Sequence, residues 1–121
     1  DLNLFSNLSV FENIQLKNTL TNHKTVDEID KFIEQVLLGQ KRDNLINKLS
    51  LGQKQRVAII RAMCQPFDFL LLDEPFSHLD KNNIKIISNI INQEIKNNNA
   101  SLIVTSLANE YFFDYDKIFN L

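Results

Sequence analysis

Glycine is scarce in this sequence. The 121 residues contain two glycines, Gly39 and Gly52, and a glutamine follows each of them. A phosphate-binding loop of the GxxxxGK[ST] type needs two glycines five positions apart, with a lysine directly after the second. No such loop exists within these residues, so the chain cannot hold nucleotide phosphates in that way.

Cysteine, long apolar runs and basic charge are scarce as well. The single cysteine, Cys64, cannot form an internal disulfide, so we expect a reducing compartment. No run of about 18 apolar residues is present, so we expect no transmembrane helix. The first residues lack a basic segment followed by an apolar stretch, so we expect no signal peptide. A formal net charge of −2 provides no basic face, and we expect no nucleic-acid partner.

What is present is typical of one small globular domain, with 44% hydrophobic and 23% charged residues. Three pairs with S/T-x-x-E/Q spacing predict helix starts, because each can form a capping box. The pairs are Ser9 with Glu12, Thr25 with Glu28, and Ser50 with Gln53.

The helices that follow these starts fill residues 1–65. The first is short and covers residues 10–16. The second is predicted to end near Gly39, and the third before Pro66. Apolar residues recur at helical spacing in the second (Val26, Ile29, Phe32, Ile33, Val36, Leu37) and in the third (Val57, Ile60, Met63).

Residues 66–121 have a different, α/β pattern. The run 67–73 is bounded by Pro66 and Pro75, is too short for a helix, and suits a parallel strand buried on both faces. Isoleucines at helical spacing follow in residues 81–96, then a polar loop at 97–99 and a second buried strand at 101–105. This order predicts a βαβ unit with parallel strands. Residues 117–121 are compatible with an edge strand.

An acidic pair, Asp73 and Glu74, ends the first predicted strand. Carboxylates at that place can hold a magnesium ion and polarise water. Taken alone, the pair is equally compatible with a strand that ends in a polar turn. Two further motifs flank it: LSLGQKQR at residues 49–56 and SHLD at residues 77–80.

This ordered set of motifs resembles the ATPase subunits of ABC transporters. LSLGQ resembles their LSGGQ signature, residues 69–73 resemble the Walker B strand with Glu74 next, and SHLD resembles the D-loop. Residues 1–13 resemble the segment just after the Q-loop glutamine. The resemblance implies a helical signature subdomain (1–65) and the C-terminal half of a P-loop NTPase, RecA-like core (66–121). The chain would then be a C-terminal fragment that lacks the Walker A loop.

The resemblance also implies roles for individual residues. Asp73 would hold magnesium, and Glu74 would orient or deprotonate the attacking water. The helix end at Ser50 is an anion site as well as an ordinary cap. Residues expected to act across a nucleotide-sandwich dimer are Ser50, Gly52 and Gln53, which would face ATP held by the second subunit, and Asp80, which would fix contacts between subunits.

Two positions depart from the family pattern. Leu51 stands where glycine is usual, which leaves the cap intact but adds bulk near the nucleotide. Counting back from Asp116, the switch histidine is replaced by Ser106; the alternative register places Leu107 there. Serine is shorter and carries no charge, so slow hydrolysis is expected.

The implied function is an ATP-binding and ATP-hydrolysing subunit that couples hydrolysis to transport. Its cofactors would be ATP and Mg²⁺, and its partners transmembrane permease subunits and a second ATPase subunit. It would be cytoplasmic and peripheral on the inner face of the cell membrane, with residues 4–16 near the groove that receives the permease. Two alternatives stay open: a soluble ABC-type ATPase not linked to transport, and a degenerate module that does not hydrolyse ATP. These 121 residues alone would be inactive.

Overall fold

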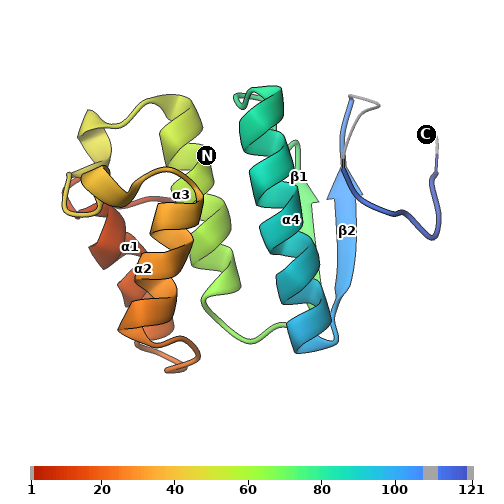
Figure 1. The fold of residues 1–121 in the computed structure, drawn as a ribbon, viewed down its shortest axis with the longest axis horizontal. Coiled ribbons are helices and arrows are strands. Elements are labelled where there is room, and N and C mark those ends of the chain that lie inside the picture. Colours follow the sequence, from red (N-terminus) through yellow and green to blue (C-terminus); the bar gives the residue numbers. More distant parts are fainter. Residues whose placement is uncertain (1, 108–111, 120–121) are drawn as a thin grey trace.

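The computed structural model describes residues 2–107 and 112–119, which form a helical half and an α/β half (Figure 1). The helical half contains α1 (Val10–Asn18), α2 (Val26–Gln35) and α3 (Leu51–Met63). Two short 3₁₀ helices, η1 (Gly39–Lys41) and η2 (Ile46–Lys48), connect α2 to α3. All three predicted capping boxes are confirmed, with both reciprocal hydrogen bonds formed at each helix start.

The α/β half is the predicted βαβ unit. Strand β1 (Phe69–Asp73) leads to α4 (Lys81–Asn98), which is followed by β2 (Ser101–Thr105). The two strands pair in parallel, with Phe69 opposite Ser101 and Asp73 opposite Thr105. Helix α4 lies against one face of the pair (Figure 1). This register brings the carboxyl ends of both strands to the same edge of the sheet.

The ends of four elements differ from the prediction. Helix α1 continues to Asn18, past its predicted end at residue 16, and α2 ends at Gln35, before Gly39. β1 begins at Phe69, so residues 67–68 lie outside the strand. The loop predicted at residues 97–99 is wrong in part, because α4 continues through Asn98. Asn99 ends the helix with a left-handed backbone (φ 50°), a conformation that asparagine tolerates better than most residues.

The prediction that both strands are buried on both faces is wrong for one face. Leu70 is buried, whereas Phe69 and Leu71 are 65% and 69% exposed, and Ile103 is 51% exposed. The reason is that α4 covers one face alone, and no element within residues 2–107 or 112–119 covers the other. The exposed face is therefore apolar.

The edge strand considered for residues 117–121 is absent from residues 117–119, and residues 120–121 lie outside the described part. Ile118 and Phe119 are 74% and 80% exposed, and no neighbouring strand within the described residues pairs with them. Just before them, Phe113 is buried and stacks on Phe76, with 5.9 Å between the ring centroids. That contact holds this segment against the turn after β1.

The buried apolar side chains form one cluster that runs through both halves. Most of the apolar residues predicted for α2 and α3 belong to it, but Val26 and Leu37 are about half exposed, since Val26 starts α2 and Leu37 follows its end. None of the helices in the described part of the chain is long and apolar enough to cross a membrane.

Polar contacts also tie the halves together. The Arg56 side chain on α3 is nearly buried, and its Nη1 donates to the Val36 carbonyl at 2.7 Å and to Asn83 Oδ1 on α4 at 2.9 Å. Lys24, between α1 and α2, pairs with Glu94 on α4, with 2.8 Å between Nζ and Oε2.

Candidate functional site

The acidic pair lies where β1 ends. Asp73 is the last residue of the strand and Glu74 the first residue of the turn that follows. Thr105, at the end of β2, donates its hydroxyl to Asp73 Oδ1 at 2.5 Å. The parallel register causes this contact, because it sets Asp73 directly opposite Thr105. The ends of the two strands therefore form one polar edge.

Glu74 has a left-handed backbone, with a φ of 44°. This conformation costs a residue with a Cβ about 1–2 kcal/mol, so the surroundings must hold it. The Glu74 amide donates to the Thr105 carbonyl at 2.9 Å. The Glu74 carbonyl accepts from Gln55 Nε2 at 3.2 Å and from the Ser77 amide at 3.4 Å. Both backbone polar groups of Glu74 are thus fixed.

The Glu74 carboxylate is fixed as well, by the segment that follows β2. The Leu107 amide donates to Oε1 at 2.6 Å, and the Ser106 hydroxyl lies 3.5 Å from Oε2. The structure therefore brings together three predicted site residues, Asp73, Glu74 and Ser106. Thr105 and the Leu107 amide join them: the sequence had not indicated Thr105, and it had indicated Leu107 only as the alternative to Ser106 at the switch position.

The N-terminal end of α3 carries the signature residues. Ser50 caps the helix: its Oγ accepts from the Gln53 amide at 3.2 Å, and Gln53 Oε1 accepts from the Ser50 amide at 2.9 Å. Leu51 points outward and is 51% exposed. The expectation that leucine at this position leaves the cap intact is confirmed. The cap uses the Gln53 amide, and no hydrogen bond within the described residues uses the Leu51 and Gly52 amides, which leaves them available to an anion.

The same helix packs against the acidic turn, by which we mean residues 74–79. A Cβ placed on Gly52 would lie 2.7 Å from the His78 carbonyl oxygen, so the missing side chain allows this close approach. One turn further along, Gln55 bonds to the turn at two places: it donates to the Glu74 carbonyl and accepts from the His78 amide at 3.3 Å. The sequence pattern contained Gln55 but assigned it no role.

Asp80 starts α4. Its Oδ1 accepts from the Asn83 amide at 2.8 Å, and the Asn83 side-chain amide donates to both carboxylate oxygens at 3.1 and 3.0 Å. The backbone hydrogen bond from Asn83 lowers the pKa of Asp80. Within the described residues no hydrogen bond joins Asp80 or Ser50 to the acidic pair, so the predicted site residues fall into three separate places.

The acidic edge has the chemistry that magnesium needs. Among the described residues Asp73 Oδ2 accepts no hydrogen bond, so an oxygen ligand remains available beside Glu74. Mg²⁺ in nucleotide sites is commonly held by one or two carboxylates together with phosphates and water. No group of three histidine, cysteine, aspartate or glutamate side chains that could hold a metal occurs in residues 2–107 or 112–119. A single carboxylate fits a metal that arrives with its nucleotide.

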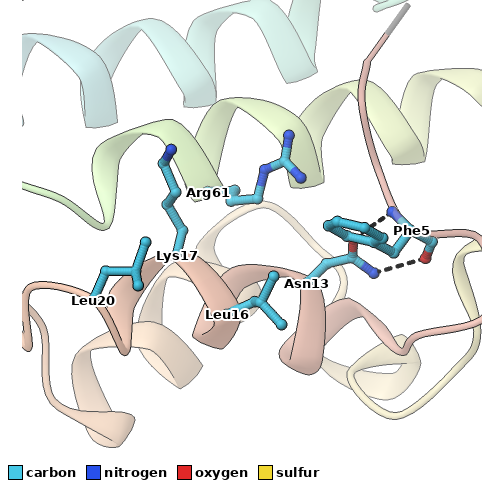
Figure 2. A pocket seen from close by; sticks show the side chains of 6 residues that line it. All are labelled: Phe5, Asn13, Leu16, Lys17, Leu20 and Arg61. Atoms are coloured by element: carbon cyan, nitrogen blue, oxygen red, sulfur yellow. Dashed lines mark hydrogen bonds between the residues drawn. The ribbon is translucent and has the colours of Figure 1, made fainter.

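A groove of about 270 Å³ lies on the other side of α3 (Figure 2). Asn13 fixes its rim, because its side chain accepts from the Phe5 amide at 2.8 Å and donates to the Phe5 carbonyl at 3.0 Å. Arg61 on α3 holds the N-terminal segment by donating to the carbonyls of Asn3 and Leu2 at 2.8 and 3.2 Å. The lining residues are Phe5, Asn13, Leu16, Lys17, Leu20 and Arg61.

Together, the parallel βαβ unit, the acidic strand end and the capped signature helix define part of a P-loop ATPase domain. The model of the ABC transporter family matches residues 1–77, and this chain belongs to that family.

Similar proteins agree with this assignment. The lipoprotein-releasing system ATP-binding protein LolD of Buchnera aphidicola is 35% identical over 106 residues, which cover 85% of this chain and 46% of LolD. The thiamine import ATP-binding protein ThiQ of Vibrio parahaemolyticus is 46% identical over 81 residues, 64% of this chain and 35% of ThiQ. The chain spans about half the length of the curated relatives it matches, or less.

Solved structures place the fold in the same group. The dimeric structure of the bacterial ABC transporter cassette MJ0796 matches with a TM-score of 0.71 and 25% identity, over 86% of this chain and 48% of that one. A putative ABC transporter ATP-binding protein from Pyrococcus furiosus matches with a TM-score of 0.76 over 92% of this chain and 56% of that one. Its identity of 19% supports the fold alone.

Proposed function

We propose that this chain is part of an ATP-hydrolysing subunit that drives transport through membrane-embedded permease subunits. The observation that carries the proposal is the strained Glu74, whose carboxylate is held at the edge formed by the ends of β1 and β2. These 121 residues contain no phosphate-binding loop, so ATP binding and hydrolysis are proposed for the full-length subunit.

In the proposed reaction Glu74 orients the attacking water and accepts its proton. Asp73 supplies an oxygen ligand to magnesium, which when bound with ATP neutralises charge on the β- and γ-phosphates. Ser106 occupies the position from which a side chain can donate to the γ-phosphate. The Thr105 hydroxyl, 2.5 Å from Asp73, orients that carboxylate so that its second oxygen faces outward.

The proposed dimer explains the signature residues. Ser50, Gly52 and Gln53 lie at the N-terminal end of α3, where free amides and the helix dipole favour an anion. We infer that this end binds the γ-phosphate of ATP held by a second ATPase subunit. Asp80, at the end of the neighbouring turn, would contact the second subunit.

The groove lined by Phe5, Leu16, Leu20 and Arg61 is the proposed docking site for the permease. Its lining combines exposed apolar side chains (Phe5, Leu16 and Leu20) with the cationic Lys17 and Arg61, which suits an amphipathic helix from a membrane protein. A subunit that docks there would be peripheral on the inner face of the membrane. The names of two relatives refer to lipoprotein release and to thiamine import, and both support a general role in transport. They name no substrate for this chain.

Substitution of Glu74 tests the proposed chemistry. In the full-length subunit Glu74→Gln should lower ATP turnover at least about a hundredfold, because an amide cannot accept the proton. ATP binding should persist, and a stable nucleotide-bound dimer should appear in size-exclusion chromatography, because a negative charge next to the γ-phosphate has been removed. Parental turnover in the variant would show that Glu74 is not the general base.

One observation favours the alternative of a non-hydrolysing module. The Glu74 carboxylate already accepts from the Leu107 amide at 2.6 Å, and a serine stands at the switch position. If this arrangement persists with nucleotide bound, the subunit would bind ATP and dimerise without turnover. The parental subunit would then behave like Glu74→Gln in both measurements.

A further inference from the structure

Gln55 is a buried polar side chain that the proposed reaction does not use. It lies on α3, is 5% exposed, and its amide group faces the acidic turn. Its Nε2 donates to the Glu74 carbonyl at 3.2 Å, and its Oε1 accepts from the His78 amide at 3.3 Å. Both ends of the amide are thus engaged with the same turn, which fixes the direction in which the side chain points.

The two contacts act at the point where the backbone is strained. Glu74 has a φ of 44°, and a residue in this conformation reverts unless several contacts hold it. Three of these contacts come from the end of β2 and the two residues after it, and one comes from within the turn. Among the described residues Gln55 makes the hydrogen bond to Glu74 that originates in α3. The orientation of Glu74 therefore depends on the position of the signature helix.

Gly52 strengthens this dependence. Its Cα lies so close to the turn that an added Cβ would be 2.7 Å from the His78 carbonyl oxygen. Gly52 and Gln55 are three residues apart on a helix, so they lie on the same face, and both contact the turn at His78. Helix and turn are joined both by close packing and by directed hydrogen bonds.

We propose that Gln55 is a positioning residue that couples the N-terminal end of α3 to the orientation of Glu74. This inference rests on the proposed function: one end of α3 would face ATP held by the second subunit, while Glu74 would act on ATP in the chain's own site. Gln55 then transmits the position of the signature helix, set by the partner's nucleotide, to the general base. We expect ATP affinity not to depend on it, because Gln55 is buried and both its Nε2 and its Oε1 bond to the turn.

The test uses the full-length subunit with Gln55→Met, which keeps the side-chain length and removes both hydrogen bonds. Gln93→Met on α4 makes the same chemical change at an exposed position and serves as the control. We expect kcat to fall about tenfold in Gln55→Met, while KM for ATP changes less than about twofold. In the double variant Gln55→Met with Glu74→Gln, the amount of nucleotide-bound dimer should also change less than about twofold relative to Glu74→Gln alone. Gln93→Met should match the parent.

A second variant distinguishes positioning from general loss of structure. A protonated glutamic acid at position 55 can donate to the Glu74 carbonyl and accept from the His78 amide, whereas a carboxylate cannot donate. In Gln55→Glu, kcat relative to the parent should therefore rise as the pH is lowered. Parental kcat in Gln55→Met, an equal loss in kcat and ATP affinity, or a pH-independent ratio in Gln55→Glu would overturn the proposal.

Amide hydrogen exchange provides a readout that does not need turnover. In Gln55→Met, exchange in a peptide covering the acidic turn should accelerate about tenfold relative to Gln93→Met, since the His78 amide loses its acceptor. The proposed function fails if the full-length parent does not hydrolyse ATP and the Glu74→Gln variant does not form a nucleotide-bound dimer. The exchange rate tests the coupling of α3 to the turn even in that case, and an unchanged rate refutes the coupling.

Discussion

At the scale of single residues, the backbone of Glu74 gives support for its role that is independent of any motif. A glutamate with positive φ is uncommon, and such strain is concentrated at functional sites. Of the four other residues with positive φ, three are asparagines, which adopt the conformation with much less strain, and the fourth is Leu37, just after the end of α2. Glu74 is fixed from β2, from α3 and from within its own turn.

Ser106 is expected to limit the rate of hydrolysis. Its hydroxyl is 3.5 Å from Glu74 Oε2, a long contact that stabilises the carboxylate only weakly. In the full-length subunit, Ser106→His should raise the single-turnover rate constant at least about tenfold, because an imidazole reaches further and can stabilise charge on the transferred phosphoryl group. Single-turnover kinetics with radiolabelled ATP measure this rate directly.

Ser106→Ala is the matched control for that experiment. Because the serine contact is long, its removal should change the rate less than about threefold. An unchanged or reduced rate in Ser106→His would show that another group has taken over the role. A parental rate typical of rapid ATPases would show that this site does not need the histidine.

The site residues differ in how well the sequence could indicate them. Asp73, Glu74 and Ser50 occur in motifs, and the structure places Asp73 and Glu74 at one strand end as expected. The Leu107 amide that holds Glu74 is a backbone group, so no residue type announces it. Gln55 was missed for a different reason: its role depends on which face of α3 contacts the acidic turn, and that is a matter of tertiary packing.

At the scale of the elements, the helix starts were predictable because a capping box is local. Both partners lie within four residues, and the structure forms all three boxes. The exposure of the strands was not predictable in the same way, since it depends on what covers the sheet. Phe69, Leu71 and Ile103 have the apolar character of a covered face, but α4 lies on the opposite one.

The capping glutamates are expected to make stability depend on pH. The backbone amide and hydroxyl of Ser9 lower the pKa of Glu12, and the Thr25 amide does the same for Glu28. A carboxylate with a lowered pKa stabilises the fold above its unfolded pKa of about 4.3, and this contribution is lost as the pH falls through the folded value. Glu12→Gln should therefore show a smaller fall in melting temperature on acidification than the parent. Identical pH profiles would contradict the assignment of the effect to this cap.

The ion pair between Lys24 and Glu94 is expected to hold the helical half against α4. The two side chains are 10% and 6% exposed, so removing one partner leaves a charge in a nearly dry place. Lys24→Met should lower the free energy of unfolding by about 3 kcal/mol, measured by chemical denaturation. The double variant Lys24→Met with Glu94→Met should recover most of that loss, because neither charge remains.

Lys31→Met provides the comparison for the ion pair, since Lys31 is an exposed lysine on α2. Its effect should stay within about 0.5 kcal/mol. A loss below about 1 kcal/mol in Lys24→Met, or no recovery in the double variant, would show that the pair contributes little to the contact between the halves.

At the scale of the whole molecule, the fold is one buried cluster with one uncovered sheet face. The cluster joins α1, α2 and α3 to β1 and α4, so the two halves predicted at residues 1–65 and 66–121 share a core. Their separation into two domains stays a prediction. The chain covers 46% of LolD and 48% of the MJ0796 cassette. More than half of each of these proteins therefore has no counterpart in the 121 residues. The apolar face of β1 and β2 is a surface that such additional parts could cover.

The last prediction concerns ATP binding by the 121 residues on their own. The phosphate-binding loop of a P-loop ATPase supplies most of the contacts to the β- and γ-phosphates, and the two glycines of this chain cannot form one. The acidic edge offers a metal ligand and the N-terminal end of α3 offers amides, but those amides would serve another subunit's nucleotide. Isothermal titration of the chain with magnesium-ATP should therefore show no saturable binding below the millimolar range, with circular dichroism as the control that the helices are formed. Micromolar affinity in a folded sample would contradict the expectation and would mean that the phosphates are held by groups other than a glycine-rich loop.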